Sequence, residues 1–169
     1  TNMYMNYEIT KNLTLRLRGA FSSNSRENDM FRPARAASLT NVNGTTATYN
    51  TSNNKSWSTD NTLTWKKKIN AHHVDVMAGF SVAANSSSSF GYATRNIPVE
   101  ALGIYGISIG SPTRLIASGN ESRLSSYFGR LNYNYQSKYL FTFTYRGDGS
   151  SKFIGKNRWG YFPSGAVAW

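Results

Sequence analysis

The sequence contains no cysteine. This absence excludes a disulfide scaffold, a thiolate zinc site, an iron–sulfur cluster and a cysteine nucleophile. The sequence also has no run of about 18 apolar residues, which excludes a transmembrane helix. Acidic residues are few: 8 Asp and Glu stand against 19 Lys and Arg, which gives a formal net charge of +11 over 169 residues. Such an excess indicates an anionic neighbour: nucleic acid, a phosphate-rich membrane surface or an acidic ligand.

Aromatic residues make up 14% of the chain, including 11 Tyr, which is not the composition of a disordered tail. Helical periodicity is weak, whereas alternation with a period of two recurs along the chain. This pattern predicts seven strands, at Met3–Ile9, Leu13–Ser23, Lys55–Trp65, His73–Val82, Arg123–Tyr135, Tyr139–Arg146 and Trp159–Trp169.

The connections between these strands alternate between short and long. Short turns follow the first, third and fifth strands, and longer connections follow the second, fourth and sixth. The two longest, about 24–54 and 83–122, are rich in Asn, Ser, Thr and Gly and are predicted to be irregular loops. In an antiparallel meander this order collects the turns at one end and the loops at the other. Outer-membrane barrels have this asymmetry, with short periplasmic turns and long extracellular loops.

Each predicted strand has one apolar and one polar face. Along Tyr127–Tyr135 the odd positions are Tyr, Gly, Leu, Tyr and Tyr, whereas the even positions are Phe, Arg, Asn and Asn. Along Leu13–Ser22 three Leu, a Gly and a Phe alternate with Thr, two Arg, Ala and Ser. A soluble sheet with one buried face has the same pattern. The alternation alone therefore leaves a sandwich core and a membrane barrel open.

The spacing of aromatic residues favours the membrane. Three pairs of rings are each eight residues apart on an apolar face: Trp57 and Trp65, Tyr127 and Tyr135, Tyr161 and Trp169. Eight strand residues tilted by about 40° rise about 20 Å along a barrel axis. This height approaches the apolar band of about 25 Å that aromatic girdles flank in outer-membrane barrels. We therefore interpret these six residues as membrane-girdle aromatics.

Because a sheet edge does not persist in lipid and bacterial barrels have an even number of strands, seven strands predict a piece of a larger barrel. The sequence also begins and ends inside apparent strands. The prediction is therefore all-β: residues 1–169 form part of a single outer-membrane β-barrel domain. Two alternatives remain. One is a complete eight-stranded barrel acting as an anchor or adhesin, which the terminal Trp169 would suit. The other is a soluble basic domain that binds nucleic acid, which the separation of aromatic residues from arginines disfavours.

The C-terminal part of the chain resembles a known family. The resemblance rests on three elements in this order: Ser126–Tyr135; Lys138–Thr142, continuing to Arg146–Phe153; and Asn157–Ser164. Their order and spacing are similar to the mid-barrel region of the SusC/RagA-type TonB-linked outer-membrane transporters of Bacteroidetes. A weaker similarity covers Trp57–Val82, in Asn61–Thr64, His72–Val76 and Ala78–Ser81.

The resemblance implies a barrel of about 22 strands that encloses a plug. It also implies import of glycan or peptide fragments, energised through TonB, and a SusD-like surface lipoprotein acting as a lid in a dimeric complex. The plug and the segment that contacts TonB are expected to lie outside these 169 residues. The outer membrane is the expected location, and nucleic acid is not an expected partner.

Four arginines on the polar faces are candidates to line the barrel lumen: Arg16, Arg18, Arg130 and Arg146. They would contact plug carboxylates or an anionic group of the substrate, or form a structural network. Basic residues in the long connections would meet lipopolysaccharide phosphates or the lid, or simply remain solvated; these are Arg26, Arg32, Arg35, Arg95 and Arg114. The run Lys66–Lys68 is interpreted as a solubilising cluster at a periplasmic turn.

Aromatic residues in the long connections are candidates to stack on substrate sugars or to contact the lid: Phe31, Tyr49, Phe90, Tyr92 and Tyr105. Packing within the loops is the other reading. His72 and His73 should point to opposite faces of a strand, so no metal site is expected. Gly147–Ser151 lacks the ending of a phosphate loop and is explained by turn chemistry. Neither a cofactor nor a catalytic arrangement is expected.

Overall fold

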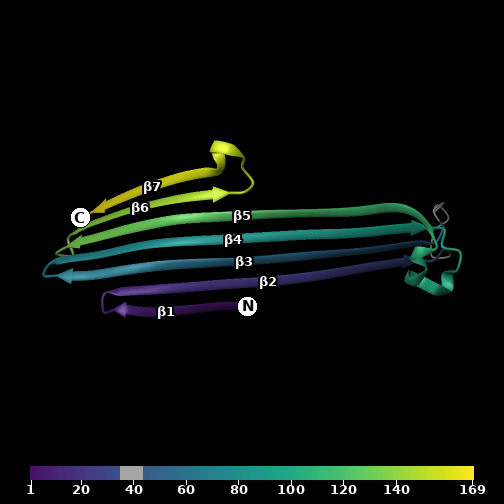
Figure 1. The fold of residues 1–169 in the computed structure, drawn as a ribbon, viewed down its shortest axis with the longest axis horizontal. Coiled ribbons are helices and arrows are strands. Elements are labelled where there is room, and N and C mark those ends of the chain that lie inside the picture. The colour runs from purple at the N-terminus through teal and green to yellow at the C-terminus, as the bar shows by residue number, and fades with distance from the viewer. Residues whose placement is uncertain (35–43) are drawn as a thin grey trace. The chain divides into compact units, whose positions relative to one another are not determined.

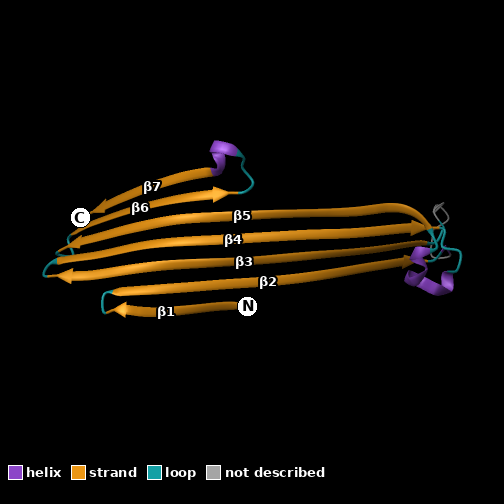
Figure 2. Ribbon diagram, viewed as in Figure 1, coloured by secondary structure: helices purple, strands orange, loops and turns teal. Residues whose placement is uncertain are grey.

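The computed structural model describes residues 1–34 and 44–169 of the chain. Seven antiparallel strands form one sheet in the order β1-β2-β3-β4-β5-β6-β7, so each strand pairs with its neighbours in sequence (Figure 1). The strands are β1 (Asn2–Thr10), β2 (Leu13–Arg32), β3 (Thr46–Ile69), β4 (His72–Arg95), β5 (Ser111–Tyr135), β6 (Tyr139–Ser150) and β7 (Trp159–Ala168). Two short 3-10 segments, η2 (Glu100–Ser108) and η3 (Gly155–Arg158), complete the structure of the described residues (Figure 2).

All seven strands predicted from the alternation are confirmed, and so is the alternation of short and long connections. The predicted irregular loops 24–54 and 83–122 are wrong over most of their length. The strands β2, β3, β4 and β5 continue through these segments, and the long connections shrink to about 33–45 and 96–110.

The reason for this difference is that alternation detects a strand only when one face meets an apolar environment. The extended strand ends are rich in Asn, Ser and Thr on both faces, as in Asn85–Ser89 of β4. Asn is depleted in strands, but this preference depends on context. Here the neighbouring strands supply backbone partners, so the ladder continues where both faces are polar.

The chain divides into two compact units. Unit 1 comprises residues 1–22, 56–85 and 122–169, and unit 2 comprises residues 23–55 and 86–121. In unit 1 the short turns are tied together by the backbone: Lys66 N donates to Asn12 O (2.8 Å) and Gln136 N donates to Ala71 O (2.9 Å). The β5–β6 turn places Gln136 and Ser137 at positive φ, and Asn134 Oδ1 accepts a hydrogen bond from Ser137 N (2.9 Å). These bonds satisfy the backbone groups at this end of the unit.

Unit 2 contains the connections that follow β2 and β4. Glu100, the first residue of η2, accepts hydrogen bonds at Oε1 from Ala34 N (3.0 Å) and Thr45 Oγ1 (2.9 Å). Asn96 N donates to Thr45 O (2.8 Å), and Ile97 beside it is 3% exposed. The two connections are therefore packed against each other, and Glu100 joins them.

The sheet is a single layer over the described residues. Only Ala47, Ala84 and Ile97 are buried apolar residues there, whereas large apolar side chains of all seven strands are exposed. A soluble sandwich would bury these side chains under a second sheet. The described residues also include no helix that is long and apolar enough to cross a membrane.

Candidate functional site

The structure brings three of the four candidate arginines together on one face of unit 1. Arg16, Arg18 and Arg130 line a hollow of about 620 Å³ that also includes Asp60 and Asp75. These side chains come from β2, β3, β4 and β5, at every second position of each strand. The predicted separation of polar and apolar faces is therefore present in three dimensions, and we call this side the polar face of unit 1.

Arg146, the fourth candidate, lies on the same face of β6. Its Nε donates to both carboxylate oxygens of Asp148 (2.8 and 2.9 Å), and its Nη2 donates to Ser126 Oγ (3.3 Å). The guanidinium also lies 5.9 Å from the centroid of the Phe128 ring, within reach of a cation–π contact. Register confirms the shared face, because Phe128 pairs with Arg146 and Ser126 pairs with Asp148.

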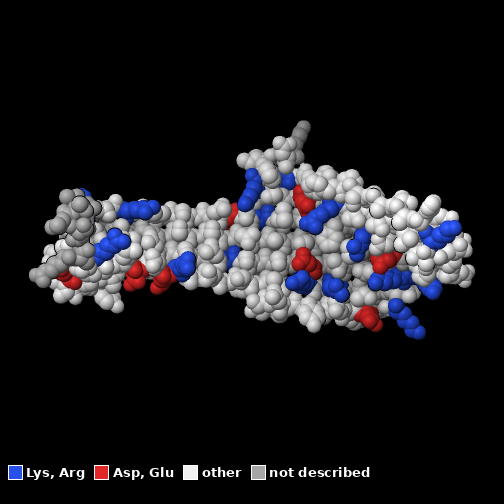
Figure 3. Space-filling model, turned by 180° about the vertical axis from the view of Figure 1, so that it is seen from behind, with Lys and Arg blue, Asp and Glu red and all other residues white. Residues whose placement is uncertain are grey.

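The carboxylates of unit 1 share this face with the arginines. Asp60, Asp75 and Asp148 lie there, and Glu8 pairs with Thr14, another residue that lines the hollow. Lys66 Nζ lies 3.6 Å from Asp75 Oδ2, and Arg16 Nε donates to Asn6 Oδ1 (2.9 Å). On the face that Figure 3 shows, Lys and Arg are interspersed with Asp and Glu. On this face of the described residues the positive charge therefore does not form one continuous basic stripe of the kind that nucleic-acid binding uses.

The contacts of Arg146 lead to a graded prediction. Arg146→Ala is expected to lower the free energy of unfolding by about 1 kcal/mol, because exposed ion pairs contribute about 0.2–1 kcal/mol and the ring contact adds to this. Arg146→Lys should lose less, since it keeps the charge but not the planar guanidinium. Urea titration of the refolded parent barrel measures both effects. Equal stability of the Ala variant and the natural protein would contradict a structural role for this network.

The predicted girdle residues lie on the opposite, apolar face of unit 1. Trp57 is 47% exposed, Tyr127 is 55% exposed and Tyr161 is 61% exposed. Trp65 is also exposed, Tyr135 is half-exposed, and Trp169 lies exposed just beyond the end of β7. Exposed rings of this size are costly in water but favourable at a boundary between lipid and water.

Ring contacts form two groups on the apolar face, separated along β5. In one group, Tyr127 lies 4.9 Å from Phe80 and 5.8 Å from Trp159, measured between ring centroids. In the other group, Tyr135 lies 4.8 Å from His72 and 6.4 Å from Tyr139. The two levels correspond to the eight-residue spacing in the sequence.

Two glycines of β6 make room for aromatic rings of β7. Gly149 pairs with Trp159 and Gly147 pairs with Tyr161 across the β6–β7 ladder. A Cβ at Gly149 would lie 2.8–2.9 Å from the Trp159 ring, and one at Gly147 would lie 3.2 Å from the Tyr161 ring. The missing side chains let the Trp159 ring cover β6 and approach Tyr127. The turn chemistry expected for Gly147–Ser151 is wrong for residues 147–150, which lie within β6; there the two glycines have this steric role instead.

The structure does not gather the five aromatic candidates into one platform. Four of them lie on extended strands and not in irregular loops: Phe31 on β2, Tyr49 on β3, and Phe90 and Tyr92 on β4. Tyr105 lies in η2 and is 87% exposed. Only Phe90 lines one of the described hollows, a cleft of about 140 Å³ in unit 2 that also includes Asn50, Gly91 and Ile116. Their role in binding stays a prediction.

The basic candidates of the long connections are likewise on strands. Arg26 and Arg32 lie on β2, Arg95 lies at the end of β4 and Arg114 lies on β5, whereas Arg35 lies outside the described residues. The two histidines do point to opposite faces: His72 contacts Tyr133 and Tyr135, while His73 and Asp75 lie on the other side. No group of three His, Asp or Glu close enough to hold a metal occurs within residues 1–34 and 44–169.

Sequence reasoning missed two polar contacts. His72 Nδ1 and Tyr133 Oη are 2.7 Å apart, on the face where only apolar packing was expected. Glu100 joins two connections that are far apart in the sequence. The alternation places both His72 and Tyr133 on apolar faces. Knowledge of which residues pair across β4 and β5 would therefore have revealed this contact. No sequence signal marks Glu100.

Taken together, the two faces and the exposed aromatic residues define the class: this is a section of the wall of a transmembrane β-barrel. No protein-family model matches the chain. TonB-dependent receptor P3 of Formosa agariphila is 34% identical over 169 residues, which cover 99% of this chain and 17% of the relative. TonB-dependent receptor SusC of Bacteroides thetaiotaomicron is 58% identical over 53 residues, which cover 31% of this chain and 5% of the relative.

Solved structures show the same fold. The structure of the RagAB peptide transporter superposes with a TM-score of 0.89 at 20% identity, covering 98% of this chain and 19% of that chain. The unliganded ferric citrate transporter FecA superposes with a TM-score of 0.57 at 9% identity and covers 98% of this chain and 23% of that one. The chain is therefore similar to the SusC/RagA-type TonB-dependent receptors, which are proteins of the outer membrane, and it spans about a sixth of the length of TonB-dependent receptor P3.

Proposed function

We propose that the chain is a barrel-wall portion of a TonB-dependent transporter that imports glycan or peptide fragments across the outer membrane. The observation that carries this proposal is the 34% identity with a TonB-dependent receptor along the whole chain. The polar and apolar faces of unit 1 support it, because a transport barrel needs a wet lumen and a lipid-facing exterior. Relatives named as receptors and transporters favour transport over catalysis.

The proposal includes the parts that lie elsewhere in the parent protein. A plug fills the barrel, a segment outside this chain contacts TonB, and a SusD-like lipoprotein closes the outer opening in a dimeric complex. RagAB, whose structure shares this fold, is a peptide transporter, which supports a peptide as one of the two substrate classes. The connections after β2 and β4 then face the cell exterior, where Tyr105 of η2 and Phe90 in the last part of β4 meet substrate or lid and the basic residues meet lipopolysaccharide.

In the same proposal, the arginines of the polar face line the lumen of the barrel. In a plugged barrel Arg16, Arg18 and Arg130 face the plug, whose carboxylates or an anionic substrate group they contact. Arg146 is already engaged by Asp148 and Ser126, so it belongs to the structural network. The contacts of Arg16 with Asn6 and of Lys66 with Asp75 support a polar network within the wall itself.

Deletion of the parent gene in its native bacterium tests the proposed function. The expected result is loss of growth on one polysaccharide or peptide as sole nutrient, restored by the intact gene and not by a copy lacking the TonB-contacting segment. An affinity-tagged parent receptor, purified from membranes in mild detergent, should bring a surface lipoprotein with it. Growth of the deletion strain on every nutrient tested, together with purification of a barrel alone, would contradict the proposal.

A further inference from the structure

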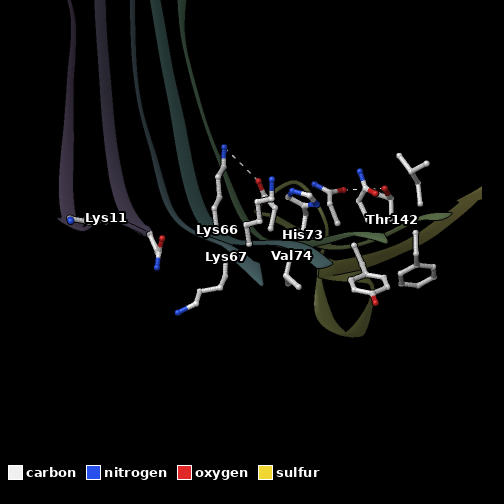
Figure 4. Close-up of a pocket in the computed structure, with 14 residues that line it drawn as sticks. Lys11, Lys66, Lys67, His73, Val74 and Thr142 are labelled. Atoms are coloured by element: carbon white, nitrogen blue, oxygen red, sulfur yellow. Dashed lines mark hydrogen bonds and ion pairs between the residues drawn. The ribbon is translucent and has the colours of Figure 1, made fainter. Parts of the chain in front are cut away.

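The three lysines Lys66–Lys68 do not act as one cluster. Lys66 and Lys67 point to opposite sides of β3, as Figure 4 shows: Lys66 lies on the side of His73, and Lys67 lies on the side of Val74. Lys66 is paired with Asp75, whereas Lys67 is exposed and has no ion pair within the described residues. The sequence suggested a single solubilising run, but Lys66 lies on the polar face of the sheet and Lys67 lies on the apolar face.

The apolar face around Lys67 has no carboxylate to neutralise it. The four acidic residues of unit 1 that the structure describes are Glu8, Asp60, Asp75 and Asp148, and all four belong to the polar face. The residues next to Lys67 on the same face of β3 are Trp65 and Ile69, and Val74 of β4 lies on that side too; all three are apolar. An unpaired ammonium group in this position, at the end of an apolar band, attracts an anion from outside the protein.

A second hydrogen-bond donor lies on the same face as Lys67. The two-residue β3–β4 turn places Lys67 opposite Val74, so His72 is its diagonal neighbour on the same face, at about 7–8 Å between strands. His72 Nδ1 shares one hydrogen bond with Tyr133 Oη (2.7 Å). If the Tyr133 hydroxyl donates to Nδ1, the neutral His72 ring carries its proton on Nε2, which remains available as a donor. If Nδ1 donates instead, the Tyr133 hydroxyl proton remains available. Either way, the pair retains one free donor.

Aromatic rings and a further lysine continue this strip across the sheet. Tyr135 contacts the His72 ring and Tyr139, and Lys138 Nζ lies 5.5 Å above the centroid of the Tyr139 ring. Beyond the strip, Val76, Phe141 and Phe143 are exposed and apolar. This arrangement matches that of a lipid molecule, because the polar donors lie at the level of a headgroup and the apolar side chains lie at the level of the acyl chains.

We propose that Lys67 and the His72–Tyr133 pair bind the phosphate of an anionic phospholipid in the leaflet at the turn end of the barrel. Short turns of outer-membrane barrels face the periplasm, so this is the phospholipid leaflet and not the lipopolysaccharide leaflet. Lys138 over Tyr139 adds a second positive charge at the same level. The inference rests on the placement of the chain in the outer membrane and requires no transport.

The test uses the full-length parent receptor in detergent, supplied with phosphatidylglycerol or phosphatidylcholine and examined by native mass spectrometry. The natural receptor is expected to retain phosphatidylglycerol preferentially. Lys67→Gln should weaken this retention about fivefold, the effect of removing one lysine near an anionic surface. Lys66→Gln is the matched control, because it removes the same charge one residue away on the opposite face, and it should leave retention unchanged.

Two outcomes would overturn the proposal: equal retention of the two lipids, or equal loss of phosphatidylglycerol in the Lys66 and Lys67 variants. Lys67→Arg should restore retention, which separates the loss of a charge from a folding defect. His72→Ala should weaken binding in the same direction as Lys67→Gln. Because the assay contains neither TonB nor substrate, its failure is independent of whether the parent protein transports glycans or peptides.

Discussion

The Val76→Arg substitution is expected to destabilise the folded parent barrel in lipid by about 2–4 kcal/mol, whereas Met77→Arg is expected to destabilise it by less than about 1 kcal/mol. The two residues are neighbours on β4 and the introduced side chain is the same. Val76 lies on the apolar face and is 39% exposed, whereas Met77 lines the polar hollow together with Asp60 and Asp75. The difference therefore isolates the environment of each face.

The position of Val76 makes this effect large. It lies four residues from His72 and four from Phe80, which belong to the two ring groups. If those groups lie at the two boundaries of the membrane, Val76 lies at the middle, where a charge on the lipid face is most costly. At position 77 the added guanidinium meets water and two carboxylates.

Refolding of the parent receptor from urea into phospholipid vesicles measures both variants, with the mobility shift of the unheated barrel on gels as a readout of folding. A cost for Met77→Arg equal to that for Val76→Arg would show that both faces are equally apolar or equally wet. A cost below about 1 kcal/mol for Val76→Arg would contradict contact of this face with acyl chains.

The sequence predicts the parts of this fold in which polar and apolar residues alternate. Alternation exists because one face meets an apolar environment and the other does not, so it locates the part of each strand between the girdles. It has no reason to persist where both faces are wet. For this reason the pattern predicts a strand over Leu13–Ser23 but not the continuation of β2 to Arg32.

The candidate residues divide in the same way. The faces of Arg16 and Arg130 follow from position within a strand, and the structure places both in one hollow. The partners of Arg146 depend on which residues lie opposite each other across β5 and β6, and a single sequence does not give that register directly. Glu100 depends on the packing of two connections and leaves no pattern at all.

A larger side chain at Gly79 is expected to prevent normal packing of the polar face. Gly79 lies on β4 beneath the ring of Phe128, and a Cβ there would overlap the ring atoms. Displacement of the ring would disturb its contact with the Arg146 guanidinium, which lies 5.9 Å from its centroid and donates to Asp148. Gly79→Val should therefore cost at least about 1–3 kcal/mol, the usual range for overpacking, and lower the yield of folded barrel.

A double-mutant cycle distinguishes this steric effect from a general intolerance of strand substitutions. Gly79→Ala in a Phe128→Leu background should cost less than in the natural background, with a coupling energy of about 0.5–3 kcal/mol, because the smaller side chain leaves room for the methyl group. Gly19→Ala on β2 is the matched control, since no atom lies within 4 Å of its added Cβ. It should be neutral or stabilising by about 0.5–1 kcal/mol, because alanine loses less backbone entropy than glycine on folding. Strictly additive costs of the Gly79 and Phe128 substitutions would show that the ring is free to leave Gly79, and the packing of Phe128 between β4 and Arg146 would then not constrain this face of the barrel.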